Sequence, residues 1–91
     1  MKREKARTPK KQSFVLNADS DTKKVCLAGD FSQWTPLPMK KSGAKFQTSV
    51  ELPPGHYQYK FIVDGQWRTD PAGLESAPDG LGGENSVVHV D

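Results

Sequence analysis

The sequence predicts an all-β protein, an antiparallel β-sandwich of immunoglobulin-like type. From Ser13 onward, apolar and polar residues alternate at period two, which is the period of a strand with one buried face. Gly and Pro recur every few residues, so no helix of ordinary length fits. A chain of 91 residues has room for one compact domain, and six or seven short strands at this spacing are typical of such a sandwich.

The alternation and the turn residues between the apolar runs locate each strand in order. The turn formers are Ser42-Gly43, Pro53-Pro54-Gly55 and Asp64-Gly65. The predicted strands cover residues 13–17, 23–28, 37–41, 45–51, 56–63, 66–69 and 86–90.

Residues 1–12 differ in composition from the rest and predict a disordered basic N-terminal arm. They hold six basic residues against Glu4, whereas residues 13–91, the predicted module, hold seven basic and ten acidic residues. Such an arm is a solvated tail or tether, which is the favoured interpretation, or a contact for anionic surfaces or nucleic acid. Because the module itself is acidic, it lacks the basic face that phosphate contacts require, and we expect no nucleic-acid partner.

The sequence also predicts a protein without disulfides, metals or membrane spans. Cys26 is the one cysteine, and no Cys/His cluster has metal-ligand spacing, so we expect neither a metal nor a cofactor. No apolar stretch is long enough to span a bilayer, and no apolar segment of signal-peptide type follows the charged start. A reducing, cytoplasmic location is the expectation.

The Asp64-Gly65 turn predicts which side of the sheet one tryptophan faces. A two-residue loop pairs Val63 with Gln66 and Ile62 with Trp67. Along residues 56–63, one face carries Tyr57, Tyr59, Phe61 and Val63 and is the predicted core face, while Gln58, Lys60 and Ile62 share the other. Trp67 is therefore expected on the outer face beside Lys60, where it has no core to fill.

The second tryptophan lies in the segment Gly29-Asp30-Phe31-Ser32-Gln33-Trp34. We expect Phe31 to turn inward onto the core and Trp34 to project outward. Two exposed indoles would form a platform whose electron-rich faces meet the C–H hydrogens of a pyranose ring. A nearby cation and side-chain amide can bind the sugar hydroxyls, and Lys60 and Asn85 are the candidates.

Three motifs in this order resemble a known family. They are G-x-F-x-x-W, then Y-x-Y-K-F-x-V-D-G-x-W-x-x-D-P, then L-G-x-x-N-x-V-x-V, and together they cover residues 13–91. The chain resembles the glycogen-binding module of AMP-activated protein kinase β subunits. It is also similar to the wider family-48 carbohydrate-binding modules, which include the early-set domains of isoamylases and branching enzymes.

The resemblance implies roles for five residues. Trp34 and Trp67 correspond to the tryptophans that stack on glucose units, and Lys60 to the lysine that hydrogen-bonds hydroxyls. Asn85 corresponds to an asparagine that is also a sugar ligand. Leu81 corresponds to a leucine that reaches into the ring of a curved glucan. An early-set sandwich that binds α-linked glucan is the implied function.

Two positions near the end of the chain depart from the family pattern. Gly83 stands where the kinase module has a threonine that contacts sugar, so one hydrogen bond to the ligand is expected to be missing. Glu84 adds a carboxylate next to Asn85 in the sequence.

Each candidate site residue also has a structural alternative. Trp67 can pack at a sheet edge, Trp34 can close one end of the sandwich, and Lys60 can be an ordinary surface lysine. Asn85 can shape the turn before the last strand, and Leu81 can fold back onto the core.

No catalytic residue is predicted. The acidic residues mostly occupy turns, His56 and His89 appear as separated single histidines, and nothing marks the carboxyl pair of a glycoside hydrolase. The leading function is a non-catalytic module that binds α-1,4-linked glucan, such as glycogen, starch or maltooligosaccharides. A separate glycogen-metabolising enzyme is a candidate partner. The alternative is an early-set domain that binds a protein partner.

Overall fold

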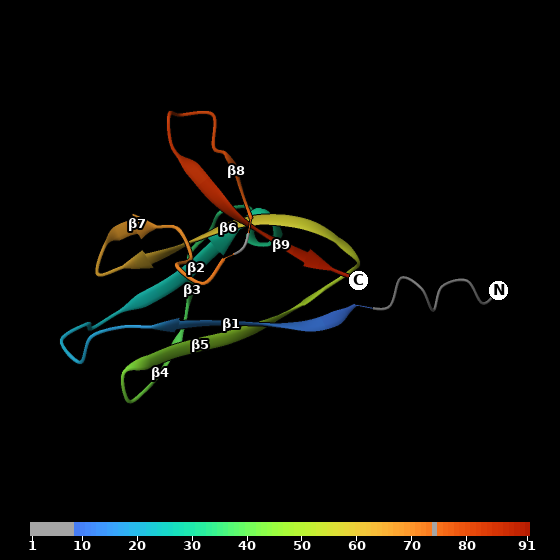
Figure 1. The fold of residues 1–91 in the computed structure, drawn as a ribbon. Coiled ribbons are helices and arrows are strands. Elements are labelled where there is room, and N and C mark those ends of the chain that lie inside the picture. Colours follow the sequence, from blue (N-terminus) through green and yellow to red (C-terminus); the bar gives the residue numbers. More distant parts are fainter. Residues whose placement is uncertain (1–8, 74) are drawn as a thin grey trace.

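The alternating residues build two antiparallel sheets that face each other in the computed structural model, which describes residues 9–73 and 75–91 (Figure 1). The strands are β1 (Lys10–Asn17), β2 (Val25–Gly29), β3 (Leu37–Pro38), β4 (Lys40–Ser42), β5 (Lys45–Leu52), β6 (Gly55–Val63), β7 (Gln66–Arg68), β8 (Ser76–Pro78) and β9 (Glu84–Val90). A single 3-10 turn at Asp30–Ser32 is the one helical element among the described residues.

The smaller sheet has the strand order β1-β5-β4. The larger sheet has the order β3-β2-β6-β9-β8, and β7 pairs with β6 as well. All strand pairs are antiparallel. The predicted all-β, immunoglobulin-like sandwich of early-set type is confirmed.

The core lies between the two sheets, because the inward positions of both carry large apolar side chains. Phe46 of the smaller sheet and Phe61, Leu27 and Val25 of the larger sheet are almost fully buried. Along β6, Tyr59 and Phe61 are buried and Tyr57 and Val63 pack against the same cluster. The predicted core face of this strand is therefore confirmed, and Gln58, Lys60 and Ile62 are left on its outer face.

The β6–β7 hairpin has the predicted register. Ile62 lies opposite Trp67 and Val63 opposite Gln66. Asp64 and Gly65 both have positive φ, 48° and 87°, as a two-residue turn of this hand requires. The carboxylate of Asp64 also accepts hydrogen bonds from the backbone N–H groups of Lys23 (3.1 Å) and Lys24 (2.8 Å), which tie the hairpin to the segment before β2.

The predicted strand at residues 37–41 is wrong, because the structure divides it into β3 and β4, which belong to different sheets. Pro38, paired with Cys26, is the last residue of β3, and the alternation along 37–41 gives no sign that the chain leaves this sheet after it. The chain then crosses between the sheets at Met39, which is buried and donates its backbone N–H to Val25 O at 3.0 Å.

Other strand boundaries also differ from the prediction, most of them by one or two residues. Strand β1 begins at Lys10, so residues 10–12, assigned to the arm, pair with Val50, Glu51 and Leu52 of β5. These three polar residues can pair because backbone hydrogen bonds need no apolar side chain, and because β5 is long enough to extend opposite them. Residues 1–8 of the predicted arm lie outside the described residues. Strand β7 ends at Arg68, and β8, which pairs with β9, was not predicted.

Within the described residues, no helix is long and apolar enough to cross a membrane.

Candidate functional site

A groove of about 540 Å³ lies on the outer face of the larger sheet, and it brings together all five of the candidate residues from the sequence. It is lined by Asp30, Trp34, Gln58, Lys60, Trp67, Asp79, Leu81 and Asn85. The five candidates come from five separate segments of the chain: the turn after β2, strand β6, strand β7, the loop that leads into β9, and β9 itself. Asp30, Gln58 and Asp79 are additional lining residues that the sequence did not single out.

The two tryptophans form an open, angled platform. Trp67 is 51% exposed, and its ring centroid lies 6.4 Å from that of Trp34, with 43° between the ring planes. Trp34 is partly buried and has a φ of 61°, a left-handed conformation that a bulky residue seldom adopts. Its backbone N–H donates to Gly29 O at 2.9 Å, which holds the turn in this shape.

Asp30 fixes the orientation of the Trp34 indole. Its Oδ1 accepts a hydrogen bond from Trp34 Nε1 at 3.1 Å, and its Oδ2 accepts one from the backbone N–H of Gln58 at 2.8 Å. The carboxylate thus connects the turn after β2 to strand β6. Phe31, between the two site residues, points inward as predicted and packs against Phe14 with ring centroids 5.5 Å apart.

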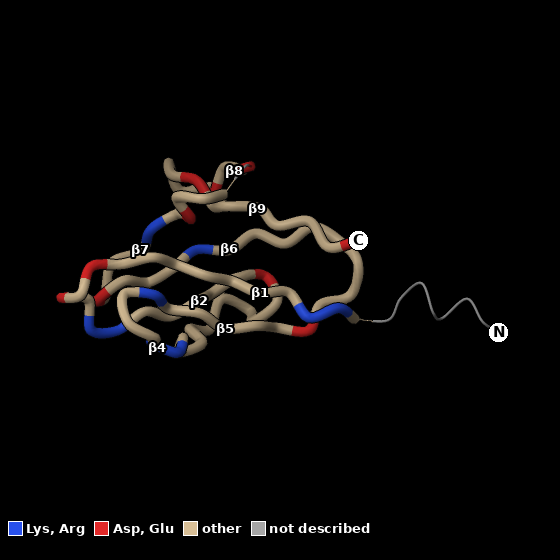
Figure 2. Tube along the Cα trace, turned by 60° about the horizontal axis from the view of Figure 1, so that its bottom comes forward, with Lys and Arg blue, Asp and Glu red and all other residues tan. Residues whose placement is uncertain are grey.

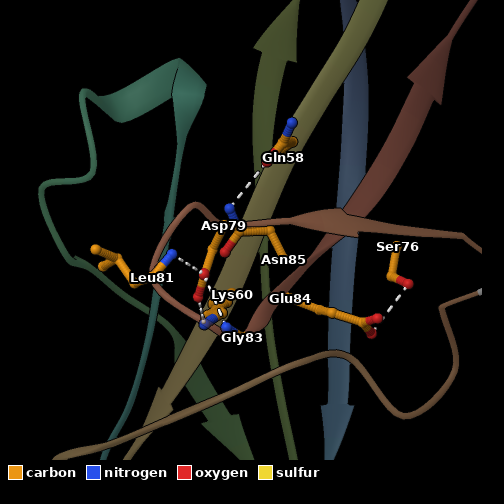
Figure 3. Close-up of polar contacts among 8 residues, drawn as sticks. All are labelled: Gln58, Lys60, Ser76, Asp79, Leu81, Gly83, Glu84 and Asn85. Carbon is orange, nitrogen blue, oxygen red and sulfur yellow. Dashed lines mark hydrogen bonds and ion pairs between the residues drawn. The ribbon is translucent and has the colours of Figure 1, made fainter.

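Lys60 projects into the groove and forms an ion pair with Asp79, with 3.2 Å between Nζ and Oδ2 (Figure 3). The other oxygen of Asp79 accepts hydrogen bonds from the backbone N–H groups of Leu81 (2.7 Å) and Gly83 (3.0 Å). These two backbone hydrogen bonds, followed by the contact with Lys60, hold the pKa of Asp79 below the usual aspartate value of 3.8. The carboxylate of Asp79 is therefore ionised at neutral pH.

Asn85 and Leu81 occupy opposite extremes of exposure. Asn85 is 8% exposed and donates from Nδ2 to Gln58 Oε1 at 2.9 Å, a contact that uses one of the four hydrogen-bonding positions of its amide. Leu81 is 91% exposed, at the tip of a turn in which Gly80 and Gly82 have positive φ. The alternative that Leu81 folds back onto the core is therefore excluded.

Glu84 does not enter the groove, although it precedes Asn85 in the chain. Successive residues of β9 point to opposite faces, and Glu84 Oε1 accepts a hydrogen bond from Ser76 Oγ at 3.2 Å (Figure 3). The structure therefore removes this carboxylate from the vicinity of the Asn85 amide.

The two histidines are not the separated single residues that the sequence suggested. His56 and His89 lie directly opposite each other on β6 and β9, with ring centroids 4.0 Å apart, and His89 also contacts Glu75. Strand register brings them together across 33 positions, which spacing along the chain does not reveal. Neither lines the groove, and within residues 9–73 and 75–91 no three His, Cys, Asp or Glu side chains form a cluster able to hold a metal.

The groove has the properties of a surface that binds a flat, hydroxyl-rich ring. The indoles supply an apolar platform, and Lys60 and Asn85 supply donors and an acceptor beside it. The three additional residues serve mainly to hold these groups in place. Asp30 and Asp79 lie in turns, where aspartate is common, and no local pattern indicates that their carboxylates reach across to β6.

A family model described as the glycogen recognition site of AMP-activated protein kinase matches residues 12–91. Human AMP-activated protein kinase subunit beta-1 is 41% identical over 68 residues, which is 75% of this chain and 25% of that protein. Human subunit beta-2 is 37% identical over 84 residues, 91% of this chain and 30% of that protein.

The chain thus spans between a quarter and a third of these two relatives; a pig beta-1 sequence, 41% identical over 68 residues, is covered to 55%. The solved structure of a maltogenic amylase from S.marinus has the same fold, with a TM-score of 0.73 at 20% identity over 87% of this chain and 13% of that one. The family match extends over nearly the whole described module. The chain belongs to the family of glycogen recognition sites of AMP-activated protein kinase.

Proposed function

We propose that this chain is a non-catalytic module that binds α-1,4-linked glucan, such as glycogen, starch or maltooligosaccharides, in the groove between Trp34 and Trp67. The observation that carries the proposal is the convergence of two angled indoles, one lysine and one asparagine on a single open surface. The family match supports the same class of ligand.

In this proposal each side chain has a separate task. The faces of Trp34 and Trp67 stack on the apolar faces of neighbouring glucose units, and the 43° between them suits a chain that curves. Lys60 has three N–H donors and uses one for Asp79, which leaves two for sugar hydroxyls. Asn85, held by Gln58, presents the rest of its amide, and the exposed Leu81 contacts the inner side of the curved chain.

The carboxylates of the groove support binding rather than hydrolysis. A glycoside hydrolase needs one carboxyl group whose pKa is raised, so that it can protonate the leaving oxygen. The pKa of Asp79 is instead lowered, and Asp30 holds the Trp34 indole and the backbone of β6. We therefore expect no release of reducing sugar from glycogen above a buffer control; release by protein free of amylase would contradict this.

The alternative is an early-set domain whose outer face binds another protein. A protein-binding scaffold has no need for all four of Trp34, Lys60, Trp67 and Asn85 on one face, so the groove favours glucan. A separate glycogen-metabolising enzyme remains a compatible partner for other surfaces of the module.

Retention on glycogen-coated or amylose resin, with cellulose resin as the control, tests the proposal. The wild-type chain should be retained on the α-glucan resins, be released by maltoheptaose, and pass through cellulose. A doubly substituted Trp34→Ala, Trp67→Ala variant that remains folded should pass through all three. Equal retention of the wild type and of this variant would place the binding surface elsewhere.

A further inference from the structure

The Asp79 carboxylate is the centre of the contacts that join β6 to the loop before β9 (Figure 3). It accepts hydrogen bonds from Lys60 Nζ on one oxygen and from the Leu81 and Gly83 backbones on the other. The backbone N–H of Asp79 also donates to Gly83 O at 3.1 Å, which closes the turn. One carboxylate therefore fixes both the position of the lysine and the shape of the loop that carries Leu81.

Gly83 makes room for this carboxylate. A β-carbon built on Gly83 would lie 2.8 Å from Asp79 Oδ2, the oxygen that holds Lys60. Gly83 is not one of the glycines with positive φ, so the requirement is for space and not for backbone conformation. A larger residue at position 83 would force the Asp79 carboxylate or the loop to shift, which would disturb the contact with the lysine.

The pairing determines the charge that a ligand meets. Among the described residues that line the groove, Lys60 is the one cation, and Asp30 and Asp79 are two carboxylates. The side chain of Lys60 is 18% exposed and that of Asp79 is 13% exposed, so the lysine is both screened from water and neutralised. A ligand hydroxyl can accept the remaining N–H groups of Lys60, whereas a ligand anion meets a groove with an excess of negative charge.

We propose that Asp79, in the space left by Gly83, makes the groove selective for uncharged α-glucan over α-glucan that carries phosphate monoesters. The inference rests on the proposed function, since it concerns the ligand of the same groove. Asp79 acts as a positioning and specificity-determining residue: it holds Lys60 for hydroxyls and withholds its charge from phosphate.

Calorimetric titration with one ligand in two forms tests this inference. The ligand is maltoheptaose that carries C6 phosphate monoesters, and its control is the same preparation after a phosphatase has removed them. The wild-type chain should bind the phosphorylated form at least about threefold more weakly at low ionic strength, and the difference should shrink at about 0.5 M salt, where charges beyond a few ångströms are screened.

Asp79→Asn should reduce this preference at least about threefold, because it leaves the charge of Lys60 unbalanced. Glu84→Gln is the matched control: it makes the same change in net charge outside the groove and should keep the wild-type preference. Gly83→Ala should act in the same direction as Asp79→Asn, and it provides a second route if the Asn variant fails to fold.

Three results would overturn the inference. Equal affinity of the wild type for the two ligand forms, or an unchanged preference in both Asp79→Asn and Gly83→Ala, would refute it and leave the proposed function intact. If the wild type fails to bind even the phosphate-free ligand, the proposed function and this inference both fail.

Discussion

Trp67 is highly exposed and lines the groove. It is 51% exposed and lies opposite Ile62 on the outer face, so Trp67→Ala removes stacking surface without opening the core. We expect the dissociation constant for maltoheptaose to rise at least about tenfold, or 1.4 kcal/mol. The free energy of unfolding should change by no more than about 0.5 kcal/mol, as for most surface substitutions.

Quenching of tryptophan fluorescence by maltoheptaose and urea denaturation measure the two quantities. Val15→Ala is the control, because Val15 is 41% exposed on the smaller sheet, away from the groove. It should leave both the affinity and the stability close to wild type. Unfolding of Trp67→Ala would mean instead that this indole stabilises the sandwich.

Tyr59 is a core residue that carries a polar hydroxyl group. Its Oη donates to Asp70 Oδ2 at 2.6 Å; burial and then this hydrogen bond raise the pKa of Tyr59 above the usual 10.0. Because the folded state keeps the proton more tightly, the resulting stability is complete below about pH 10 and is lost as the pH rises beyond it, when the unfolded tyrosine ionises.

Tyr59→Phe should therefore lower the free energy of unfolding by roughly 1 to 2 kcal/mol at neutral pH, because Asp70 loses a hydrogen-bond donor. It should also flatten the fall in stability above about pH 10. Urea denaturation at several pH values measures both effects. An alkaline profile identical to that of the wild type would show that Tyr59 ionises as easily in the folded state as in the unfolded state.

The β6–β7 hairpin is the element that carries Trp67, and its turn depends on Gly65. Gly65 has a φ of 87° and open space around it. The substitution Gly65→Ala therefore strains the backbone without causing a collision, and we expect it to lower the free energy of unfolding by about 1 kcal/mol. Gly43 in the β4–β5 turn has a φ of 65° and equally open surroundings, so Gly43→Ala provides a matched control.

Both variants should lose similar stability in urea, since the strain is alike. Gly65→Ala alone should also weaken glucan binding, by about two- to fivefold, because a distorted turn moves Trp67 relative to Trp34. If the two variants bind glucan equally well, the hairpin does not position the indole.

Local patterns in the sequence predict much of the larger sheet. Alternation identified β6 and its core face, and Asp64-Gly65 set the register that places Trp67 beside Lys60. The change of sheet at Met39 and the short β8 have no such local pattern, since both depend on partners supplied by the rest of the fold. The Lys60–Asp79 pair joins residues 19 positions apart, and its existence depends on how the loop before β9 closes around Gly83.

At the scale of the whole molecule, charge is divided between the two sheets. The strands of the smaller sheet carry five lysines and one glutamate, whereas acidic residues gather around β8 and the loop before β9 (Figure 2). The groove thus lies on the more acidic part of the molecule. Electrostatic attraction will contribute little to binding, and the affinity for a neutral glucan has to come from stacking and hydroxyl contacts.

The expected affinity for a single maltoheptaose is consequently weak. An open groove leaves one side of each glucose unit in water, and hydrogen bonds to the protein largely replace hydrogen bonds to water. We expect a dissociation constant of roughly 10 μM to 1 mM, about −7 to −4 kcal/mol. Calorimetric titration at low and high salt measures it, and the value for this neutral ligand should barely change between the two, because no net charge attracts it. A nanomolar constant, or one that weakens steeply with salt, would require contacts beyond the indoles, Lys60 and Asn85.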